Sequence, residues 1–179
     1  MNETTNKQIE KEKYIVLDIE TTGLNPWYGD RITCICAKDN KGNRFEIVDE
    51  SEFNIIDQFM VWLCKLKFHL GIDKYMFLTK NGKQFDIPFI LLLRRVLFKY
   101  KDDDILDLLR CKHFDLQEVT TKRISLQSMA ELLNTTPKSE TGENAIKLWE
   151  TKEYDKLKEY CSQDVDTTEE VYLKWKSLR

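Results

Sequence analysis

The sequence lacks any long apolar run, and this absence excludes one class of protein. No apolar stretch in the 179 residues approaches the roughly 20 residues that a membrane-spanning helix requires. The first 13 residues are polar and charged, so they do not resemble a secretory signal peptide. We therefore expect a cytoplasmic protein without membrane segments, in which residues 1–13 form a short mobile leader.

The sequence also lacks paired cysteine motifs. Its five cysteines are an odd number and include no CxxC pair, so their spacing indicates neither a disulfide framework nor a thiolate zinc site. All five lie in apolar segments, which favours reduced thiols in the core of a cytosolic protein. They are Cys34, Cys36, Cys64, Cys111 and Cys161.

Internal repeats, low-complexity tracts and Pro/Ser-rich linkers are absent as well. A chain of this length without such boundaries is most simply one domain, which we place at residues 14–179. Hydrophobic residues make up 41% of the chain and charged residues 33%. This is the composition of a globular protein with a substantial core and a well-solvated surface.

The net charge of −3 at first argues against a nucleic-acid partner. The objection weakens if four of the acids are metal ligands, as argued below, because bound cations then neutralise them. Basic side chains in several segments are available to contact phosphates, although an ordinary solvated surface is the simpler explanation for any one of them. These side chains are Lys80, Lys83, Arg94, Arg95, Lys122 and Arg123.

Apolar periodicity and turn residues predict how strands and helices follow one another. Three strands come first, at 14–17, 31–37 and 44–48, and the turn 39–43 makes the last two an antiparallel pair. The later elements are a helix at 52–67, a strand at 75–78, a helix at 87–100, a strand at 113–116, a helix capped by Ser125 that runs to Leu133, and a final helical region from Gly142 to about Trp175. This order predicts an α/β fold with a mixed β-sheet flanked by α-helices.

Two carboxylates lie at the end of the first strand. Asp18 and Glu20 follow the apolar run Tyr14–Leu17, and alternation along a strand places both on the same face. Carboxylates this close repel each other, and a buried charge is costly unless it is neutralised. A hard divalent cation such as Mg²⁺ is the usual remedy, since it prefers oxygen ligands. The segment therefore predicts a metal site whose remaining ligands come from elsewhere in the chain.

A third acid, Asp86, follows the strand 75–78. The segment Asn81-Gly82-Lys83-Gln84-Phe85-Asp86 leaves this strand, so Asp86 is expected in the loop at the strand's end. Taken alone, Asp86 is better explained as the N-cap of a helix that begins at Ile87-Pro88. Its candidacy as a ligand depends on the other acids.

The fourth acid, Asp164, lies within the inward-facing stripe of the final helix. That stripe consists of Leu157, Tyr160, Cys161, Thr168, Val171 and Trp175. A charged residue at a core-facing position is costly unless it is paired or bound to a metal, and the alternative is a buried ion pair with Lys or Arg. Tyr160 is one helical turn before Asp164 and shares its face.

Together these segments resemble the three motifs of the DEDD (DnaQ-like) superfamily of 3′–5′ exonucleases, which includes polymerase proofreading domains and ribonuclease D. The three segments are Asp18-Ile19-Glu20-Thr21-Thr22-Gly23-Leu24, Asn81–Asp86 and Tyr160-Cys161-Ser162-Gln163-Asp164. Tyrosine in the third motif marks the DEDDy subclass, and neither His69 nor His113 can take its place. The chain is similar to stand-alone exonucleases related to the proofreading domain of family B DNA polymerases, and the resemblance implies an RNase H-like fold.

The resemblance implies an enzyme that removes nucleotides from the 3′ end of single-stranded DNA by hydrolysis assisted by two Mg²⁺ or Mn²⁺ ions. Four carboxylates would be the metal ligands, and Tyr160 would orient the attacking water. The implied metal ligands are Asp18, Glu20, Asp86 and Asp164, and the implied contacts to the terminal nucleotide are Thr21, Thr22, Leu24, Asn81 and Phe85. The sequence indicates no particular protein partner.

Three alternatives remain open. An exoribonuclease would use the same residues, since no motif reads the 2′-hydroxyl. A non-catalytic nucleic-acid-binding module would keep the fold, although four intact and mutually repelling acids argue against it. An endonuclease of the RNase H or resolvase type also uses acidic two-metal sites, but the TTGL segment and the YxxxD helix are not part of its pattern.

His113 and Asp115 are assigned a structural role, because no further metal-ligand spacing accompanies them.

Overall fold

The computed structural model of the protein describes residues 12–70, 75–92, 112–136 and 142–179. Most of the predicted leader and the second half of the predicted helix 87–100 lie outside the described residues, as does Cys111. Among the residues that are described, no helix combines the length and the apolar character needed to cross a membrane.

The described strands form one mixed sheet in the order β3-β2-β1-β4-β5. The first three strands are paired antiparallel, whereas β4 and β5 run parallel to β1. Their bounds are β1 (Lys13–Thr21), β2 (Ile32–Asp39), β3 (Arg44–Val48), β4 (Tyr75–Thr79) and β5 (Lys112–Asp115). The predicted mixed sheet is therefore confirmed, and β3 has the bounds expected from the sequence.

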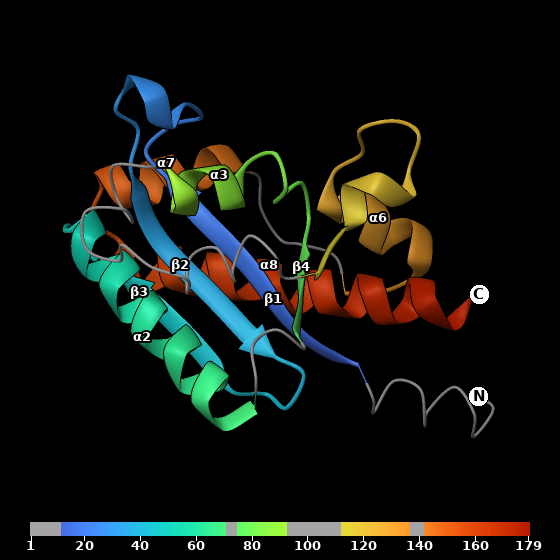
Figure 1. Ribbon diagram of the computed structural model, residues 1–179. Coiled ribbons are helices and arrows are strands. Elements are labelled where there is room, and N and C mark those ends of the chain that lie inside the picture. The colour runs from blue at the N-terminus through green and yellow to red at the C-terminus, as the bar shows by residue number, and fades with distance from the viewer. Residues whose placement is uncertain (1–11, 71–74, 93–111, 137–141) are drawn as a thin grey trace.

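Side chains of β1 alternate between two apolar cores, one on each face of the sheet. The odd-numbered residues from Ile15 to Ile19 belong to the first core, which α2 (Glu52–Leu70) covers. Tyr14 and Val16 belong to the second core, which α8 (Tyr154–Ser177) covers. Figure 1 shows α2 in front of the sheet and α8 behind it. The sheet is thus enclosed between helices on both faces.

Shorter helices extend these two layers. They are α3 (Asp86–Leu91), α6 (Leu126–Leu133), α7 (Gly142–Glu150) and the 3₁₀ helices η1 (Pro26–Tyr28) and η3 (Leu116–Val119). Phe89 of α3 joins the first core, and Met129 of α6 joins the second. Ser125 caps α6 as predicted, because its Oγ accepts a hydrogen bond from the backbone N–H of Ser128 at 3.0 Å.

The predicted final helical region consists of two helices. The first, α7, ends at Glu150, and α8 begins at Tyr154. Between them Lys152 has a φ of 58°, in the left-handed region that residues other than glycine rarely adopt. Because neither glycine nor proline occurs at this break, the sequence pattern did not predict it.

Candidate active site

A cleft of about 410 Å³ lies beside the end of β1 and the middle of α8. It brings together every residue predicted to act in catalysis and two of those predicted to contact the substrate. These residues are Asp18, Glu20, Asn81, Phe85, Asp86, Tyr160 and Asp164. They come from β1, from the segment that follows β4 and from α8, so the three sequence motifs converge in space.

Asp18 and Glu20 owe their direction to strand alternation. They continue the series of Tyr14 and Val16, whose side chains lie in the core beneath α8, so both carboxylates face α8. Both residues are half-buried. The ladder between β1 and β4 reaches only as far as Val16, which leaves the edge of β1 beyond that point available to other groups.

Asp86 occupies the part of the β1 edge, beyond Val16, that β4 does not pair with. Its Oδ1 accepts a hydrogen bond from the backbone N–H of Ile19 at 3.1 Å, which attaches the carboxyl group to β1 between Asp18 and Glu20. Helix α3 begins at Asp86 itself, and its N-cap residue Phe85 makes no side-chain cap hydrogen bond. The N-cap role considered from the sequence is therefore not the one that Asp86 has.

The environment of Asp86 disfavours its charged form. Burial raises its pKa to about 7, and the nearby carboxylates of Asp115 and Asp164 act in the same direction. Hydrogen bonds from the backbone N–H groups of Asp86 and Ile19 offset part of this effect. A divalent cation stabilises the charged form of a carboxylate in such a position, so the electrostatics of the cleft fit a metal site.

Helix α8 contributes a tyrosine and an acid to the cleft. Tyr160 and Asp164 both lie on its buried face, with 5% and 6% of their surface exposed, so the predicted inward position of Asp164 is confirmed. Burial raises the pKa of Tyr160 far above its ordinary value, and the charges of Asp164, Glu20 and Asp18 raise it further. The phenol is therefore protonated at neutral pH, and it can donate a hydrogen bond but cannot serve as a base.

The four acids surround one cleft without forming one compact cluster. In the described parts of the chain, ligand atoms of Asp18, Glu20 and Cys161 lie within 4.8 Å of one another, whereas Asp86 and Asp164 belong to no such group. Repulsion between like charges favours this spreading. Carboxylate oxygens are suitable donors for Mg²⁺ or Mn²⁺, but the compact four-acid site that the resemblance implies is not observed.

Asp115 holds the segment that carries the second motif. Its carboxylate accepts hydrogen bonds from the backbone N–H groups of Asn81 at 2.7 Å, Lys83 at 3.0 Å and Gln117 at 2.8 Å. The structural role expected of Asp115 is therefore confirmed, and it proves to be a role in positioning the cleft. No sequence pattern predicts this role, because the bonds to Asn81 and Lys83 join segments more than 30 residues apart.

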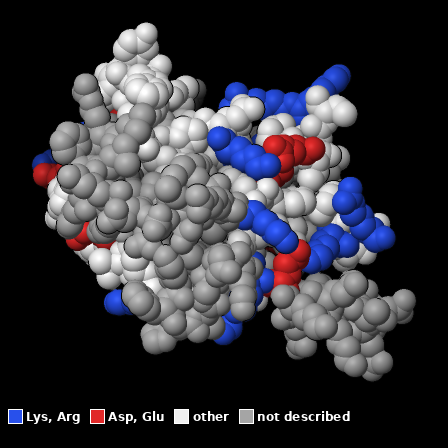
Figure 2. Space-filling view, in the orientation of Figure 1, with Lys and Arg blue, Asp and Glu red and all other residues white. Residues whose placement is uncertain are grey.

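Basic and polar side chains that no motif contains also line the cleft. They are Lys80, Arg123 and Ser125, accompanied by Ile124. Lys80 and Arg123 are two of the basic residues that the sequence makes available to contact phosphates, and the structure places both beside the acids. On the face shown in Figure 2, Lys and Arg side chains gather on the right-hand side, where α6 and the end of α8 lie in Figure 1.

Thr21 is the last residue of β1, and Thr22 and Leu24 follow it in the next loop; none of the three lines the cleft. The Thr21 hydroxyl donates a hydrogen bond to the carbonyl of Gly23. The Thr22 hydroxyl accepts one from the backbone N–H of Arg31 at 3.0 Å, so both threonines shape this loop. The Leu24 side chain is 81% exposed and is therefore available to a ligand.

The sheet order, the two helical layers and the acid-lined cleft define an RNase H-like α/β protein. A family model described as the RNase_H superfamily matches residues 15–176, and the chain belongs to this family. Comparison with curated protein sequences gives no significant match.

Two solved structures show the same fold. A family B DNA polymerase from the hyperthermophilic archaeon Pyrobaculum calidifontis is similar with a TM-score of 0.66 and 16% identity, over 88% of this chain and 23% of the polymerase chain. An apo structure of exonuclease I is similar with a TM-score of 0.50 and 14% identity, over 93% of this chain and 42% of the other. The chain thus spans less than half the length of either protein, and the likeness is one of fold.

Proposed function

We propose that this protein is a metal-dependent 3′–5′ exonuclease of the DEDDy subclass that removes nucleotides from the 3′ end of single-stranded DNA. One observation carries the proposal: residues of three separate motifs resembling that subclass line a single cleft. Membership of the RNase_H superfamily and the shared fold with a family B polymerase support it at the level of architecture. We take residues 14–179 as the catalytic domain.

The acids of the cleft would hold two Mg²⁺ or Mn²⁺ ions. Asp18, Glu20, Asp86 and Asp164 would supply the oxygen ligands. When bound, such ions lower the pKa of a ligated water and stabilise the charge on the leaving 3′ oxygen. The raised pKa of Asp86 supports this assignment, since it reflects burial of the carboxyl group and, to a smaller extent, the nearby carboxylates of Asp115 and Asp164.

Tyr160 would position the attacking water. Because its pKa is raised well beyond the neutral range, the phenol keeps its proton and cannot remove one from water. It can donate a hydrogen bond to the oxygen of the water and thereby fix the direction of attack. The buried ring has little freedom to leave this position.

The rest of the lining suits a flexible strand of any sequence. Asn81 and Phe85 would contact the terminal nucleotide, and Leu24 would pack against its base. Lys80 and Arg123 would contact phosphates. Apolar contacts with bases tolerate every base, so we expect trimming without sequence preference. A duplex should be a poor substrate unless its 3′ end frays.

The proposal is tested with 5′-labelled single-stranded DNA and RNA of the same sequence, incubated with Mg²⁺ or Mn²⁺ and, separately, with EDTA. We expect a metal-dependent ladder that shortens from the 3′ end and is absent for Asp18→Ala. The faster polymer decides between DNA and RNA. Circular single-stranded DNA should remain intact, and its cleavage would indicate an endonuclease. If folded protein produces no ladder with either polymer, the proposal fails in favour of a non-catalytic binding module.

Tyr160→Phe separates the role of the tyrosine from that of the metals. We expect this variant to lower kcat on the order of 10²-fold, because a poorly oriented water attacks slowly, and to leave the Mg²⁺ concentration for half-maximal activity unchanged. Tyr154→Phe is the matched control, since Tyr154 lies on the same helix but bonds Glu50 outside the cleft. An unchanged kcat in Tyr160→Phe would remove Tyr160 from the mechanism.

A further inference from the structure

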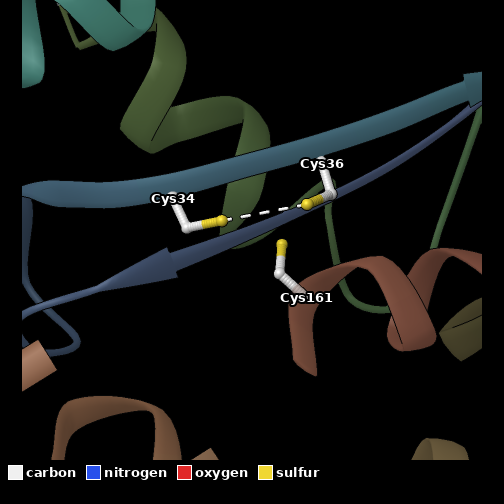
Figure 3. A group of neighbouring side chains, drawn as sticks. All are labelled: Cys34, Cys36 and Cys161. Carbon is white, nitrogen blue, oxygen red and sulfur yellow. Dashed lines mark hydrogen bonds between the residues drawn. The ribbon is translucent and has the colours of Figure 1, made fainter. Parts of the chain in front are cut away.

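Three cysteines meet directly behind the candidate active site. Cys34 and Cys36 lie two residues apart on β2 and therefore point to the same face of the sheet, toward α8. Cys161 reaches them from α8 (Figure 3). The three sulfur atoms all lie within 4.8 Å of one another, and at most 1% of each residue is exposed.

The spacing of the sulfur atoms matches that of ligands around one metal ion. The Sγ atoms of Cys34 and Cys36 are 3.8 Å apart. In a tetrahedral zinc site with Zn–S bonds of about 2.3 Å, neighbouring sulfur atoms are roughly 3.8 Å apart. The third sulfur comes from Cys161 on α8, which faces the two cysteines of β2. The three donors therefore surround a point and do not form a row along the strand.

A soft cation is the natural occupant of this site. Thiolates select ions such as Zn²⁺, Cd²⁺ and Cu⁺, whereas Mg²⁺ and Mn²⁺ favour carboxylate oxygens. An oxygen donor is also close, since the Sγ of Cys161 lies 3.4 Å from Oδ2 of Asp18. The thiols and the acids are therefore adjacent donor sets of different chemical preference, and Cys161 belongs to both groups.

We propose that Cys34, Cys36 and Cys161 form a binding site for one soft divalent cation of the zinc group. The site adjoins the hard-metal site of the proposed nuclease, and its binding can be measured without nuclease activity. On binding, each thiol releases its proton to solvent and the thiolate takes its place as a ligand. The cysteine spacing alone did not suggest such a site, because the third ligand follows more than a hundred residues later on another element.

The test uses the full chain, reduced, freed of metal and titrated with Cd²⁺ as the probe under anaerobic conditions. We expect thiolate-to-metal charge-transfer absorption in the ultraviolet that saturates at one equivalent of Cd²⁺. A large excess of Mg²⁺ should leave this absorption unchanged, because a hard ion competes poorly for thiolates.

Single substitutions then assign the ligands. Cys34→Ser, Cys36→Ser and Cys161→Ser should each weaken Cd²⁺ binding by at least about tenfold. Cys64→Ser is the matched control, since Cys64 lies on α2, on the other side of the sheet, and should bind as the unaltered chain does. Circular dichroism of each variant establishes that it is folded.

Three results would overturn the proposal. The first is the absence of saturable charge-transfer absorption in the unaltered chain, a measurement that needs no variant and is therefore independent of variant folding. The second is full displacement of Cd²⁺ by excess Mg²⁺. The third is weakened binding in Cys64→Ser alone. Any of them would leave the cluster as three ordinary buried thiols.

Discussion

At the scale of single residues, Asp86 has the least conventional environment in the cleft. Its Oδ1 accepts a hydrogen bond from the backbone N–H of Ile19, a group that would otherwise bond to a neighbouring strand. This bond replaces a strand partner with a carboxyl group and brings an acid from a distant part of the chain between Asp18 and Glu20. Its position makes Asp86 sensitive to the charge around it, and this sensitivity can be measured without a substrate.

Asp86 should make the metal-free protein less stable as the pH rises. Burial raises its pKa to about 7 in the folded chain, whereas an aspartate in the unfolded chain has a pKa of about 3.9. Between these values the folded state binds more protons than the unfolded state, so this group's contribution to stability falls from about pH 4 to about pH 7. Asp86→Asn, which cannot ionise, should lose less stability between about pH 5 and about pH 8 than the unaltered chain.

This is measured as the free energy of urea unfolding in the presence of a chelator. Asp155→Asn is the control, because its side chain is fully exposed, and it should follow the pH dependence of the unaltered chain. If Asp86→Asn loses stability as steeply as the unaltered chain, the carboxyl group is already charged in the folded protein and the electrostatic account of the cleft is wrong.

At the scale of elements, the segment between β4 and α3 depends on a strand that contributes no catalytic side chain. Asp115, at the end of β5, binds the backbone of this segment at Asn81 and Lys83. The Oγ1 of Thr79 and the Nε2 of His113 add a further bond of 2.7 Å between the two strands. The second motif is therefore positioned by β5.

Asp115→Asn should loosen this segment. An amide retains one acceptor oxygen and places an NH₂ group against a backbone donor, so at least one buried N–H loses its partner. We expect a loss of about 2–4 kcal/mol in the free energy of unfolding and, if the proposed function holds, a raised KM for single-stranded DNA.

The control for Asp115→Asn is Glu118→Gln on the adjacent η3. Glu118 forms an exposed ion pair with Lys83, which is worth no more than about 1 kcal/mol. Equal effects of the two substitutions on unfolding would show that the buried hydrogen bonds of Asp115 do not hold the segment.

The elements that the sequence predicted best are those with local signals. Alternation and a polar turn define β3, and Ser125 marks the start of α6, so both agree with prediction. The break between α7 and α8 has no such signal, because Lys152 adopts a backbone conformation that its residue type does not favour.

In the candidate site, too, the features with local signals were predicted from the sequence and the contacts between distant segments were not. Spacing within each motif predicted that Asp18 and Glu20 share a face and that Asp164 points inward. Contacts between motifs were beyond the sequence: the attachment of Asp86 to Ile19, and the meeting of Cys161 with the thiols of β2. These depend on the register of the sheet and on the placement of α8, which only the folded chain defines.

At the scale of the whole molecule, a net charge of −3 coexists with basic side chains at the cleft. Local charge decides where an anionic polymer approaches. Lys80 and Arg123 lie beside the acids, and Figure 2 shows further basic side chains on the same face as α6. The overall charge is therefore a poor guide to the partner of this protein.

Arg123→Gln should weaken binding of single-stranded DNA. We expect the slope of log K against log salt concentration to become shallower by about 1, as for the loss of one phosphate contact. The measurement is fluorescence anisotropy of a labelled oligonucleotide, made in an Asp18→Ala background so that the ligand stays intact.

Lys41→Gln is the matched charge control for Arg123→Gln. Lys41 is exposed in the turn between β2 and β3, at the end of the sheet opposite the cleft. It should leave the slope unchanged. Equal changes in slope for the two variants would mean that binding follows total charge and that the cleft does not direct it.

The bond between Cys161 and Asp18 joins residues 143 positions apart, and this separation bears on timing during synthesis. A chain still attached to the ribosome carries the first two acids long before α8 has been made. Until α8 is made and has docked, neither Tyr160 nor Asp164 can reach the cleft. A nascent chain without α8 therefore lacks a complete cleft, and the proposed activity arises only in a molecule in which α8 has docked.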